Sequence, residues 1–482
     1  MEILLESDQR LRRASLPIGS IDAPTRGQIE GCFETLTELR KRHGFGRALA
    51  APQVGIGRRL IAVDLGAGPF AVVNPEITWR TEETFEVWDD CFSVPDKLAR
   101  VRRHRSISLD YRDDRLRLRR WERLPPDLAE LLQHEIDHLD GVLMTDRALE
   151  VRPASERASL IDSARPRRRL SLERIAEAAR VIDPVFLHSP QFLCEPLSEQ
   201  LGCSLTLKVE TVNPIRSFKG RGADFFAGSL AENEPLVCAT AGNFGQGLAY
   251  ACRRRNIPLT VYAPRTANPL KVERMRALSA EVRLAGDDFD AAKETARRER
   301  GARMVEDGAI AAISEGAGSI GVELLARGDA FDVVLVPLGN GALLNGVARF
   351  VKAASPATRV VGVCARGAPS MARSFQRGAP VLTPRVETIA DGIAVRAPIP
   401  EAVEDMQGVV DDVLLADDAA MVEAVRLLHR HTGLVVEPAG AAGLAAMLGA
   451  AGAFAGRSVA TILCGGNVTP AQAHQWFGGG DG

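Results

Sequence analysis

The chain has 482 residues, of which 46% are hydrophobic and 25% are charged, and its formal net charge is −2 at pH 7. Because this length exceeds one ordinary domain, two or three soluble globular domains are expected. The small net charge gives no reason to expect a nucleic-acid or membrane-surface partner, and neither a spanning apolar run nor a secretory signal is present.

Eight cysteines are scattered along the chain without the spacing of a disulfide framework. In a chain this long they indicate reduced thiols and a cytoplasmic protein. Only seven residues are lysines, so few side chains could form an imine with an aldehyde cofactor, because arginine cannot. The cysteines are Cys32, Cys91, Cys194, Cys203, Cys238, Cys252, Cys364 and Cys464.

Residues 1 to 147 predict a mixed domain of helix and strands. Apolar residues recur at helical spacing between Thr25 and His43. A stretch rich in glycine, alanine and proline follows from Gly44 to Gly55 and allows close backbone approach. Strands are expected at residues 60–65, 70–74, 100–111 and 116–121.

A helix that begins at Pro125-Pro126 carries His134-Glu135-Ile136-Asp137-His138. Because positions i and i+4 share a face, the two histidines can bind one metal, with Glu135 beside a metal-bound water. The alternative is a pair of surface histidines on an acidic helix. Cys91 offers a thiolate as third ligand, and Gln53 offers an amide donor for an oxyanion. Three ligands and an open position are typical of a hydrolytic metal site.

The segment from residue 2 to 147 resembles peptide deformylase. The three motifs of that family correspond to Gly46 to Gln53, Asp89 to Ser93 and Gln133 to Gly141. The resemblance implies Cys91, His134 and His138 as ligands of Fe²⁺ or Zn²⁺. It implies Glu135 as general acid and base, with Gln53 and the backbone N–H of Phe92 at the oxyanion. A metal-bound water would attack a formamide carbonyl and release formate and an amine.

This segment departs from the deformylase pattern around the pocket. Ala48 stands where the family has glycine, Asp89-Asp90 replaces Glu-Gly, and Phe92 replaces leucine. These changes leave the implied ligands in place but point away from an N-formylmethionyl peptide as substrate. Arg103 corresponds loosely to a substrate-side arginine of the family. A non-catalytic binding or regulatory module is the alternative for this segment.

Residues 148 to 169 are rich in charge, proline and serine and predict a linker. Its run from Arg167 to Arg169 could contact nucleic acid. Such a short run is more typical of solvated surface, or of a linker that docks on an acidic partner domain.

The rest of the chain, residues 170 to 482, predicts alternating strands and helices, beginning with a helix capped by Ser171. Such alternation gives parallel sheets with functional loops at the carboxyl ends of the strands. The expected strands are residues 205–210, 236–238, 259–262, 282–284, 333–337, 360–364 and 459–463.

One lysine lies in an unusual setting, the run Asn213 to Gly222, where Ser217 and Phe218 precede Lys219 and glycines follow. We expect Lys219 to form an imine with pyridoxal phosphate, because small and aromatic neighbours suit an enclosed aldehyde cofactor. Lys208, by contrast, is expected at the surface. Small-residue loops after three strands could hold anions or form tight turns: Thr240 to Gly247, Leu338 to Gly346, and Cys464 to Asn467.

Residues 170 to 475 resemble the threonine and serine dehydratases of pyridoxal-phosphate fold type II. The matching motifs are the lysine run, Thr240 to Gln246, Glu315 to Gly321, Ile389 to Val395, Glu437 to Ala441 and the Cys464 loop. The resemblance implies that Lys219 binds the cofactor and shuttles the Cα proton, that Phe218 packs near the ring, and that Asn243 bonds the phenolic oxygen. The phosphate would be held by Gly339, Asn340, Gly341, Ala342 and Leu343. Cys464 would face the pyridine nitrogen, and an uncharged partner there fits β-elimination.

This segment has departures of its own. The phosphate loop reads Gly-Asn-Gly-Ala instead of four glycines, which is similar to threonine synthases, so the cofactor is better indicated than the reaction. Cys364-Ala365 stands where many members have Glu-Pro at a cation site, so that cation is not expected. Because few residues follow Cys464, an added regulatory domain is not expected.

These patterns together predict a fusion. An α+β deformylase-like domain (1–147) and a linker (148–169) would precede an α/β fold type II domain (170–482) with two parallel-sheet subdomains. The expected activity is elimination of water from threonine or serine to give a 2-oxo acid and ammonia, joined to removal of an N-formyl group. The alternative is β-replacement or another specialised lyase beside a non-catalytic module. Small-molecule amino-acid and N-formyl substrates, and a homodimer, are expected.

Overall fold

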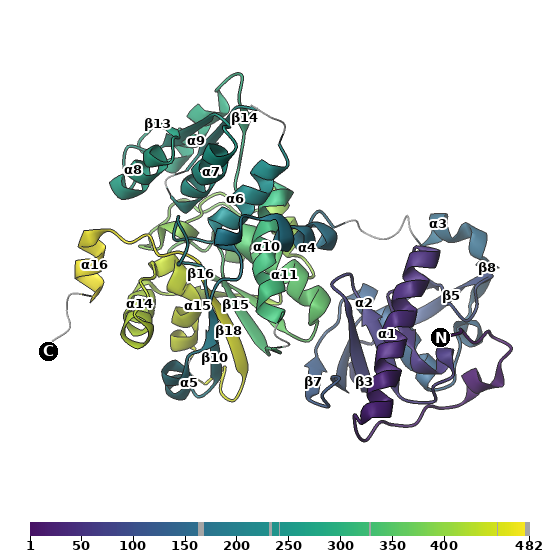
Figure 1. The fold of residues 1–482 in the computed structure, drawn as a ribbon. Helices are drawn as coiled ribbons and strands as arrows, with labels where there is room; N and C mark the ends of the chain where they lie inside the picture. Colours follow the sequence, from purple (N-terminus) through teal and green to yellow (C-terminus); the bar gives the residue numbers. More distant parts are fainter. Residues whose placement is uncertain (162–167, 231–233, 241, 327–328, 451, 478–482) are drawn as a thin grey trace. The chain divides into compact units, whose positions relative to one another are not determined.

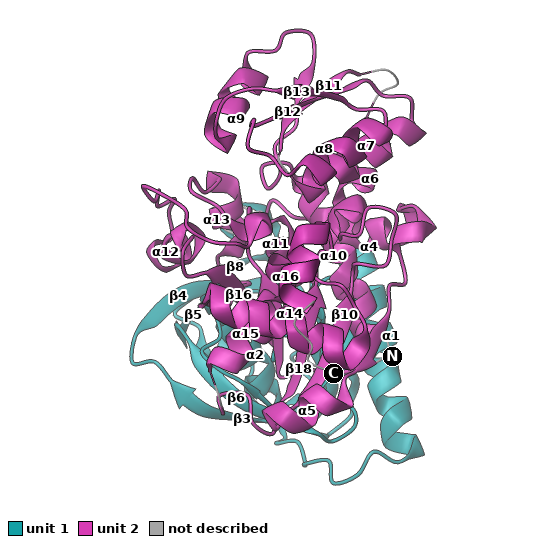
Figure 2. Ribbon diagram, turned by 90° about the vertical axis from the view of Figure 1, so that its left-hand side faces the viewer, with its two compact units in different colours: residues 1–167, 353–357 teal, residues 168–352, 358–482 magenta. Residues whose placement is uncertain are grey.

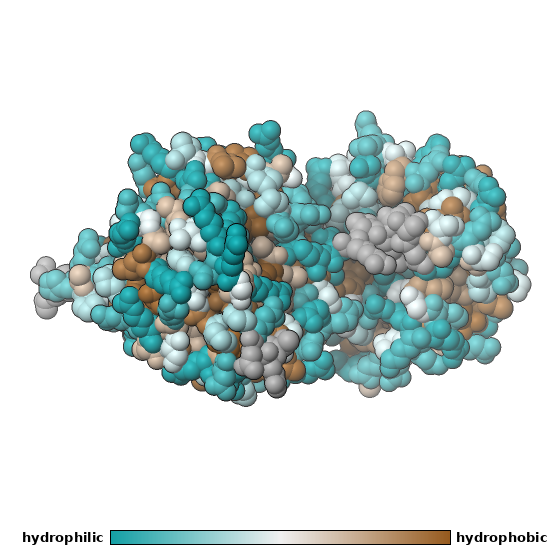
Figure 3. Space-filling view, turned by 90° about the horizontal axis from the view of Figure 1, so that it is seen from above, coloured by the Kyte–Doolittle hydropathy of each residue, from teal (hydrophilic) through white to brown (hydrophobic). Residues whose placement is uncertain are grey.

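The computed structural model describes residues 1–161, 168–230, 234–240, 242–326, 329–450 and 452–477. The chain divides into two compact units, residues 1–167 with 353–357 and residues 168–352 with 358–482 (Figure 2). Within the described ranges, no helix is both long enough and apolar enough to cross a membrane. The face drawn in Figure 3 is mostly hydrophilic, with hydrophobic residues in small scattered groups.

The first unit contains two antiparallel sheets with the strand orders β1-β2-β3-β6-β7 and β4-β5-β8. Its core lies between the larger sheet and two helices, α1 and α2. The elements are α1 (Ala23–His43), β1 (Ala48–Ala50), β2 (Leu60–Asp64), β3 (Pro69–Arg80), β4 (Thr84–Asp89), β5 (Lys97–His104), β6 (Ile107–Arg112), β7 (Leu118–Trp121), α2 (Pro126–Leu139), β8 (Glu150–Pro153) and α3 (Arg157–Leu160).

The first unit extends further along the chain than the predicted boundary at residue 147. Strand β8 pairs with β5, with Arg100 opposite Glu150 and Lys97 opposite Pro153. The start of the segment predicted as a linker is therefore part of a sheet. Strand β8 has only four residues, and three of them are exposed. No apolar periodicity therefore marks it in the sequence.

The second unit contains a six-stranded sheet, in the order β17-β16-β15-β18-β10-β9, and a four-stranded sheet, in the order β13-β12-β11-β14 (Figure 1). All strand pairs are parallel except β9 with β10. The strands are β9 (Gln191–Leu193), β10 (Ser204–Val209), β11 (Leu236–Ala239), β12 (Leu259–Ala263), β13 (Glu281–Leu284), β14 (Arg303–Met304), β15 (Val333–Pro337), β16 (Arg359–Ala365), β17 (Asp412–Ala416) and β18 (Ser458–Leu463).

Helices connect these strands, as expected for parallel neighbours. Ser171 caps the first helix by accepting a hydrogen bond from the backbone N–H of Arg174, which confirms the predicted cap. The helices are α4 (Leu172–Val181), α5 (Glu195–Leu201), α6 (Lys219–Gly228), α7 (Asn243–Arg254), α8 (Pro269–Ala277), α9 (Phe289–Arg297), α10 (Ala311–Leu325), α11 (Ala342–Ala354), α12 (Ser370–Arg377), α13 (Pro400–Met406), α14 (Asp418–Thr432), α15 (Pro438–Gly449) and α16 (Pro470–Phe477).

Strand register brings the carboxyl ends of the central strands to one edge of the six-stranded sheet. Val209 at the end of β10 pairs with Leu463 at the end of β18. Strand β15 runs beside β18 in the same direction, with Leu335 opposite Thr461. Lys219 lies after β10, Gly339 lies in the loop after β15, and Cys464 lies in the loop after β18. The seven strands predicted for this segment are confirmed within a residue or two.

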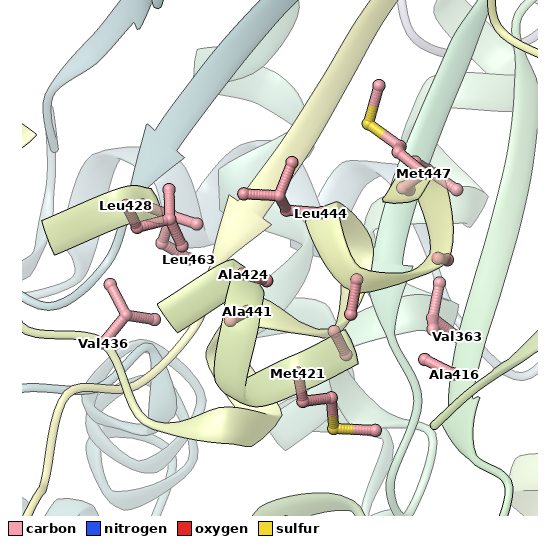
Figure 4. Close-up of a cluster of buried hydrophobic side chains, with 14 of the residues drawn as sticks. Val363, Ala416, Met421, Ala424, Leu428, Val436, Ala441, Leu444, Met447 and Leu463 are labelled. Carbon is pink, nitrogen blue, oxygen red and sulfur yellow. The ribbon is translucent and has the colours of Figure 1, made fainter. Parts of the chain in front are cut away.

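A large hydrophobic cluster includes Leu463, the last residue of β18 before Cys464 (Figure 4). Leu444 of α15 and Leu428 of α14 are fully buried in it, beside Leu463 of β18. Small residues such as Ala441 let α15 pack close to the sheet. This packing holds the end of β18, and therefore the Cys464 loop, in place.

The expectation that Lys208 lies at the surface was wrong. The residue is 1% exposed, and its Nζ donates to Glu323 Oε2 at 2.6 Å and to the Ser189 carbonyl oxygen at 2.9 Å. Arg221 of α6 is fully buried in the same network and donates to Glu323 and Glu210. A buried charge requires a paired partner, and here two carboxylates supply it. The network anchors the helix that begins with Lys219.

Candidate active sites

In the first unit, the structure brings together the three residues predicted as metal ligands. The ligand atoms of Cys91, His134 and His138 all lie within 4.8 Å of one another, and all three residues are buried. Cys91 Sγ is 3.2 Å from His138 Nε2. Cys91 follows the end of β4, whereas the histidines lie one turn apart on α2. A compact set of one thiolate and two imidazoles suits a tetrahedral divalent metal that keeps an open position.

Gln53 and Glu135 lie beside these ligands. Gln53 is held by the Ala50 N–H, which donates to its Oε1 at 2.9 Å, and its Nε2 points to Cys91 Sγ at 3.4 Å and to Ser93 Oγ at 3.3 Å. Burial raises the pKa of Glu135 to about 7. Among the described residues, Glu135 Oε2 has no hydrogen-bond partner. A buried carboxylate oxygen without a partner is costly unless a ligand or water meets it.

An ion-pair chain supports the ligands from behind. Asp89 Oδ2 lies 3.0 Å from His134 Nδ1 and accepts a 2.8 Å hydrogen bond from Arg103. Arg103 also donates to Asp137 Oδ2 at 2.6 Å. Although burial opposes the charged imidazole, the Asp89 hydrogen bond raises the pKa of His134. A carboxylate behind a ligating histidine fixes the orientation of the ring.

Arg103 is therefore not on the substrate side. It is 3% exposed and is engaged by Asp89 and Asp137 behind the ligand cluster. Asp89 was noted in the sequence only as a departure in the pocket loop. Its contact with His134 could not be seen there, because the two residues are 45 positions apart.

The residues that depart from the deformylase pattern, Ala48, Asp89, Asp90 and Phe92, all line the pocket. The rings of Phe45 and Phe92 stack at 5.3 Å, and a Cβ on Gly46 would lie 2.2 Å from the Phe92 ring. Arg157 pairs with Asp90 at 2.7 Å and covers the Phe45 ring. The space in the pocket that the centre of a water molecule can reach has a volume of about 40 Å³. Because a single water molecule needs roughly 10–15 Å³ of such space, the pocket suits a small substrate.

In the second unit, Lys219 is the first residue of α6, directly after the loop that follows β10. Its Nζ lies 4.6 Å from the centre of the Phe218 ring and donates to Asp307 Oδ2. The Phe218 N–H and the Ser217 hydroxyl both donate to the carbonyl oxygen of Cys464, at 3.1 and 3.2 Å. The two residues before the predicted lysine are thus hydrogen-bonded to the loop that carries the predicted thiol.

Asn243 is fixed by two partners from distant parts of the chain. Its Nδ2 donates to Glu437 Oε1 at 2.7 Å, and its Oδ1 accepts from Asn467 Nδ2 at 2.8 Å. Burial raises the pKa of Glu437, which also lies 3.9 Å from Lys271 Nζ. Ala241, within the predicted carboxylate loop, lies outside the described residues.

The loop from Gly339 to Leu343 joins β15 to the first turn of α11. Gly341 has φ +91°, and a Cβ there would lie 2.9 Å from Asn345 Nδ2. A Cβ on Gly339 would lie 2.7 Å from the carbonyl oxygen of Gly392. The backbone N–H groups of a first helical turn lack intrahelical acceptors and suit a phosphate. Positions 339 and 341 of this cradle therefore favour glycine.

Cys464 is buried at the end of β18 and is uncharged, because burial raises the pKa of its thiol. A lysine amine, a glycine cradle and a neutral thiol therefore lie at one edge of the six-stranded sheet, and the Cys464 loop contacts the anchored amide of Asn243 through Asn467. This set fits pyridoxal phosphate, whose aldehyde, phenolic oxygen, phosphate and ring nitrogen each require a different partner.

Three residues of this site were not identified by the sequence alone: Lys271, Asp391 and Asp307. Lys271 Nζ donates to Asp391 Oδ2 at 2.6 Å and would lie 3.9 Å from a Cβ on Gly242, at the start of α7. Burial opposes the charge of Lys271, but Glu437 and Asp391 raise its pKa. Asp391 lies within a matching motif and Lys271 among the seven lysines, so both carried a weak signal. Asp307 carried none.

Two family models match the chain. One, described as pyridoxal-phosphate dependent enzyme, matches residues 183–465. The other, described as polypeptide deformylase, matches residues 1–154. The two segments predicted from the motifs are therefore both found by the family models, in the same order.

Several known proteins are similar to the second unit. An L-threonine ammonia-lyase of Thermotoga maritima is 35% identical over 305 residues, which cover 62% of this chain and 76% of that protein. The solved structure of processed threonine deaminase isoform 2 from Solanum lycopersicum has 28% identity and a TM-score of 0.59, covering 64% of this chain and 88% of that one. Maize serine racemase has 28% identity and a TM-score of 0.60, covering 64% and 96%.

Proposed function

The chain belongs to the family of pyridoxal-phosphate dependent enzymes, and we propose that its second unit is a lyase acting on a hydroxy amino acid of the threonine or serine type. The products are a 2-oxo acid and ammonia. The observation that carries the proposal is that the Lys219 loop after β10 and Asn243 at the start of α7 both contact the loop after β18 that carries Cys464. The similarity to threonine ammonia-lyases supports the same substrate class.

Each side chain has a distinct task in this proposal. When bound, pyridoxal phosphate withdraws electrons from the amino acid and weakens its Cα–H bond. Lys219 Nζ takes the Cα proton. Asn243, held by Glu437, would donate to the phenolic oxygen, and the loop around Gly341 would hold the phosphate. The neutral Cys464 thiol would face the ring nitrogen without fixing a full positive charge there, which would favour elimination over transamination.

The substrate carboxylate is assigned to the start of α7. The N–H groups of a first helical turn favour an anion, and the buried ammonium of Lys271 lies beside Gly242. This placement leaves the Cα proton for Lys219 and directs the β-substituent to the remaining side of the site. Water leaves the hydroxy amino acid, and the unsaturated product then takes up water and releases ammonia.

For the first unit we propose a metal-dependent hydrolase that removes a formyl group from nitrogen. Cys91, His134 and His138 would hold Fe²⁺ or Zn²⁺, which lowers the pKa of a bound water. Gln53 Nε2 would donate to the oxygen of the formyl group, and Glu135 would accept and return a proton. The narrow, partly aromatic pocket supports a free N-formyl amino acid as substrate.

The two activities are tested separately on the full chain loaded with cofactor and metal. L-threonine and L-serine should yield oxo acid, and Lys219→Arg should abolish it; no oxo acid from either amino acid rejects the lyase. N-formyl amino acids should yield formate, and Glu135→Gln should stop this release without changing oxo-acid formation. Unchanged formate release by Glu135→Gln would reject the hydrolase. If both activities are present, the freed amine of the first is a candidate substrate for the second.

A further inference from the structure

We propose that Asp307 determines substrate choice at the lysine site. It favours amino acids that carry a protonated amino group on Cβ over those that carry a hydroxyl group there. The proposal rests on the lyase function above and adds a second substrate class, which the same site would prefer to hydroxy amino acids. The smallest amino acid of this kind is 2,3-diaminopropionate. Serine and threonine, which carry a hydroxyl group there, would be weaker substrates.

Asp307 lies on a loop pressed against the predicted phosphate cradle. The loop runs between β14 and α10, and the next residue, Gly308, has φ +90°. A Cβ on Gly308 would lie 2.3 Å from the carbonyl oxygen of Asn340. Arg169 donates to the carbonyl oxygens of Gly308 and Ala309 at 3.1 and 2.6 Å. The backbone beside Asp307 is therefore fixed next to the reacting lysine.

The Asp307 carboxylate has one oxygen engaged and one unengaged. Oδ2 accepts from Lys219 Nζ, whereas Oδ1 is buried and has no hydrogen-bond partner among the described residues. The whole residue is 8% exposed. Leaving a buried carboxylate oxygen without a donor is costly. Asp307 Oδ1 can therefore accept one further hydrogen bond, close to the lysine that reacts with the substrate.

Neighbouring cations do not supply that donor, because their ion-pair partners lie elsewhere. Lys293 pairs with Glu306, Lys271 with Asp391, and Arg169 with Asp405. Lys219 is thus the one cation paired with Asp307 in the described part of the chain. To take the Cα proton, Lys219 must be an uncharged amine, so in the reacting state Asp307 is not paired with a lysine ammonium. The carboxylate then needs a donor from the ligand.

Only one polar group of an amino-acid substrate can donate the hydrogen bond to Asp307 Oδ1. The α-amino group is used at the cofactor, and a carboxylate would be repelled by Asp307 and is assigned to the start of α7. The β-substituent remains. An ammonium there gives a charge-assisted hydrogen bond, which is roughly twice as strong as one from a neutral hydroxyl.

The chemistry balances for this substrate without an added co-reactant. The Cα–H bond breaks and its proton passes to Lys219 Nζ. The Cβ–N bond breaks with its electron pair on nitrogen, so the ammonium leaves as neutral ammonia and needs no proton from the protein. The unsaturated product takes up one water and releases the second ammonia. One 2,3-diaminopropionate and one water thus give one pyruvate and two ammonia molecules.

The experiment compares kcat/KM for L-2,3-diaminopropionate and L-serine in the cofactor-loaded full chain. The wild-type protein should prefer the diamino acid, and Asp307→Asn should lower that preference by about 10- to 100-fold, as expected for loss of one charge-assisted hydrogen bond. Asp287→Asn, at a side chain that is 93% exposed, is the matched control and should leave the preference unchanged.

A binding measurement gives a readout that does not depend on turnover. L-2-aminobutyrate has a methyl group in place of the β-ammonium and cannot be eliminated. Its dissociation constant, measured from the absorbance of the bound cofactor, should be the same within about twofold in wild type and Asp307→Asn. This ligand has no β-ammonium, so it makes no charged contact with Asp307 that the substitution could remove. A larger change would indicate a general structural role for Asp307 and would overturn the proposal.

The remaining outcomes separate this proposal from the function on which it rests. If the wild-type protein converts serine or threonine but shows no preference for the diamino acid, Asp307 is not the selecting residue, and the lyase stands. If Asp307→Asn lowers activity on all substrates equally, the selection proposal is again rejected. If neither L-serine nor L-threonine yields oxo acid, the hydroxy-amino-acid lyase function itself fails. The wild-type comparison needs no substitution, so a poorly folded variant cannot obscure it.

Discussion

Asn243 Nδ2 donates a 2.7 Å hydrogen bond to Glu437 Oε1, which joins the start of α7 to the residue that precedes α15, 194 positions later in the chain. The second oxygen of Glu437 accepts from the Asn467 N–H at 3.2 Å. One buried carboxylate therefore holds the amide predicted to meet the cofactor and the loop that carries Cys464. This contact makes Glu437 a positioning residue of the site.

Replacing Glu437 with glutamine should weaken cofactor binding. The variant keeps the size of the side chain but turns one accepting oxygen into a donor, so it cannot serve both Asn243 and Asn467. Loss of a hydrogen bond to a charged group predicts a rise of about 10-fold or more in the dissociation constant of pyridoxal phosphate. Titration followed by absorbance measures it. Glu404→Gln, on the exposed face of α13, is the control, and equal constants for both variants would contradict the prediction.

The glycine cradle gives a second prediction. Gly341→Ala places a Cβ 2.9 Å from Asn345 Nδ2 at a φ of +91° and should both destabilise the second unit and weaken retention of the cofactor. Gly378 has φ +70° but nothing within 4 Å of a built Cβ, so Gly378→Ala carries the backbone strain of about 1 kcal/mol alone. Cofactor content after gel filtration distinguishes the two. Full retention by Gly341→Ala would show that the loop does not hold the phosphate.

Metal content provides a third prediction. His134→Asn removes one of the three clustered ligands, so metal measured after purification should fall from about one per chain to well below half. His431→Asn, on the exposed end of α14, is the matched control and should keep its metal. The oxo-acid activity of the second unit should be the same in both proteins. Undiminished metal in His134→Asn would exclude this cluster as the binding site.

The buried network around Glu323 predicts a pH dependence of stability. Burial by itself favours the neutral acid, but Arg221 and Lys208 lower the pKa of Glu323 to about 2. Because the unfolded chain has the ordinary value near 4.5, the ionised form stabilises the fold above pH 4.5. That contribution, at most about 3 kcal/mol, is lost as the pH falls toward 2.

The free energy of unfolding, measured in urea at pH 6 and pH 3, checks this sign. Wild type should lose more stability between the two pH values than Glu323→Gln, which has no carboxyl group to protonate. Glu195→Gln, on exposed α5, should follow wild type. If Glu323→Gln and wild type lose the same amount of stability, Glu323 is not the source of the pH dependence.

Much of the secondary structure could be predicted from local pattern. Apolar periodicity identified the strand that ends at Leu463, and Ser171 marked a helix start, because both signals lie within a few residues of the element they define. Strand β8 and the two-residue strand β14 were not predicted, since short strands carry too little periodicity. The burial of Lys208 was missed for a related reason: its partner Glu323 is 115 positions away.

The sequence by itself determined the two families and the side chains that are candidates for chemistry, because motifs such as Ser217-Phe218-Lys219 and His134-Glu135-Ile136-Asp137-His138 are contiguous. Only the tertiary structure decided what surrounds them. In the structure, Arg103 pairs with Asp89 behind the ligand cluster and not on the substrate side, and Asp307 pairs with Lys219. Such contacts depend on the register of distant strands and on burial, which give a lone aspartate or arginine its role and leave no mark on the residues next to it in the chain.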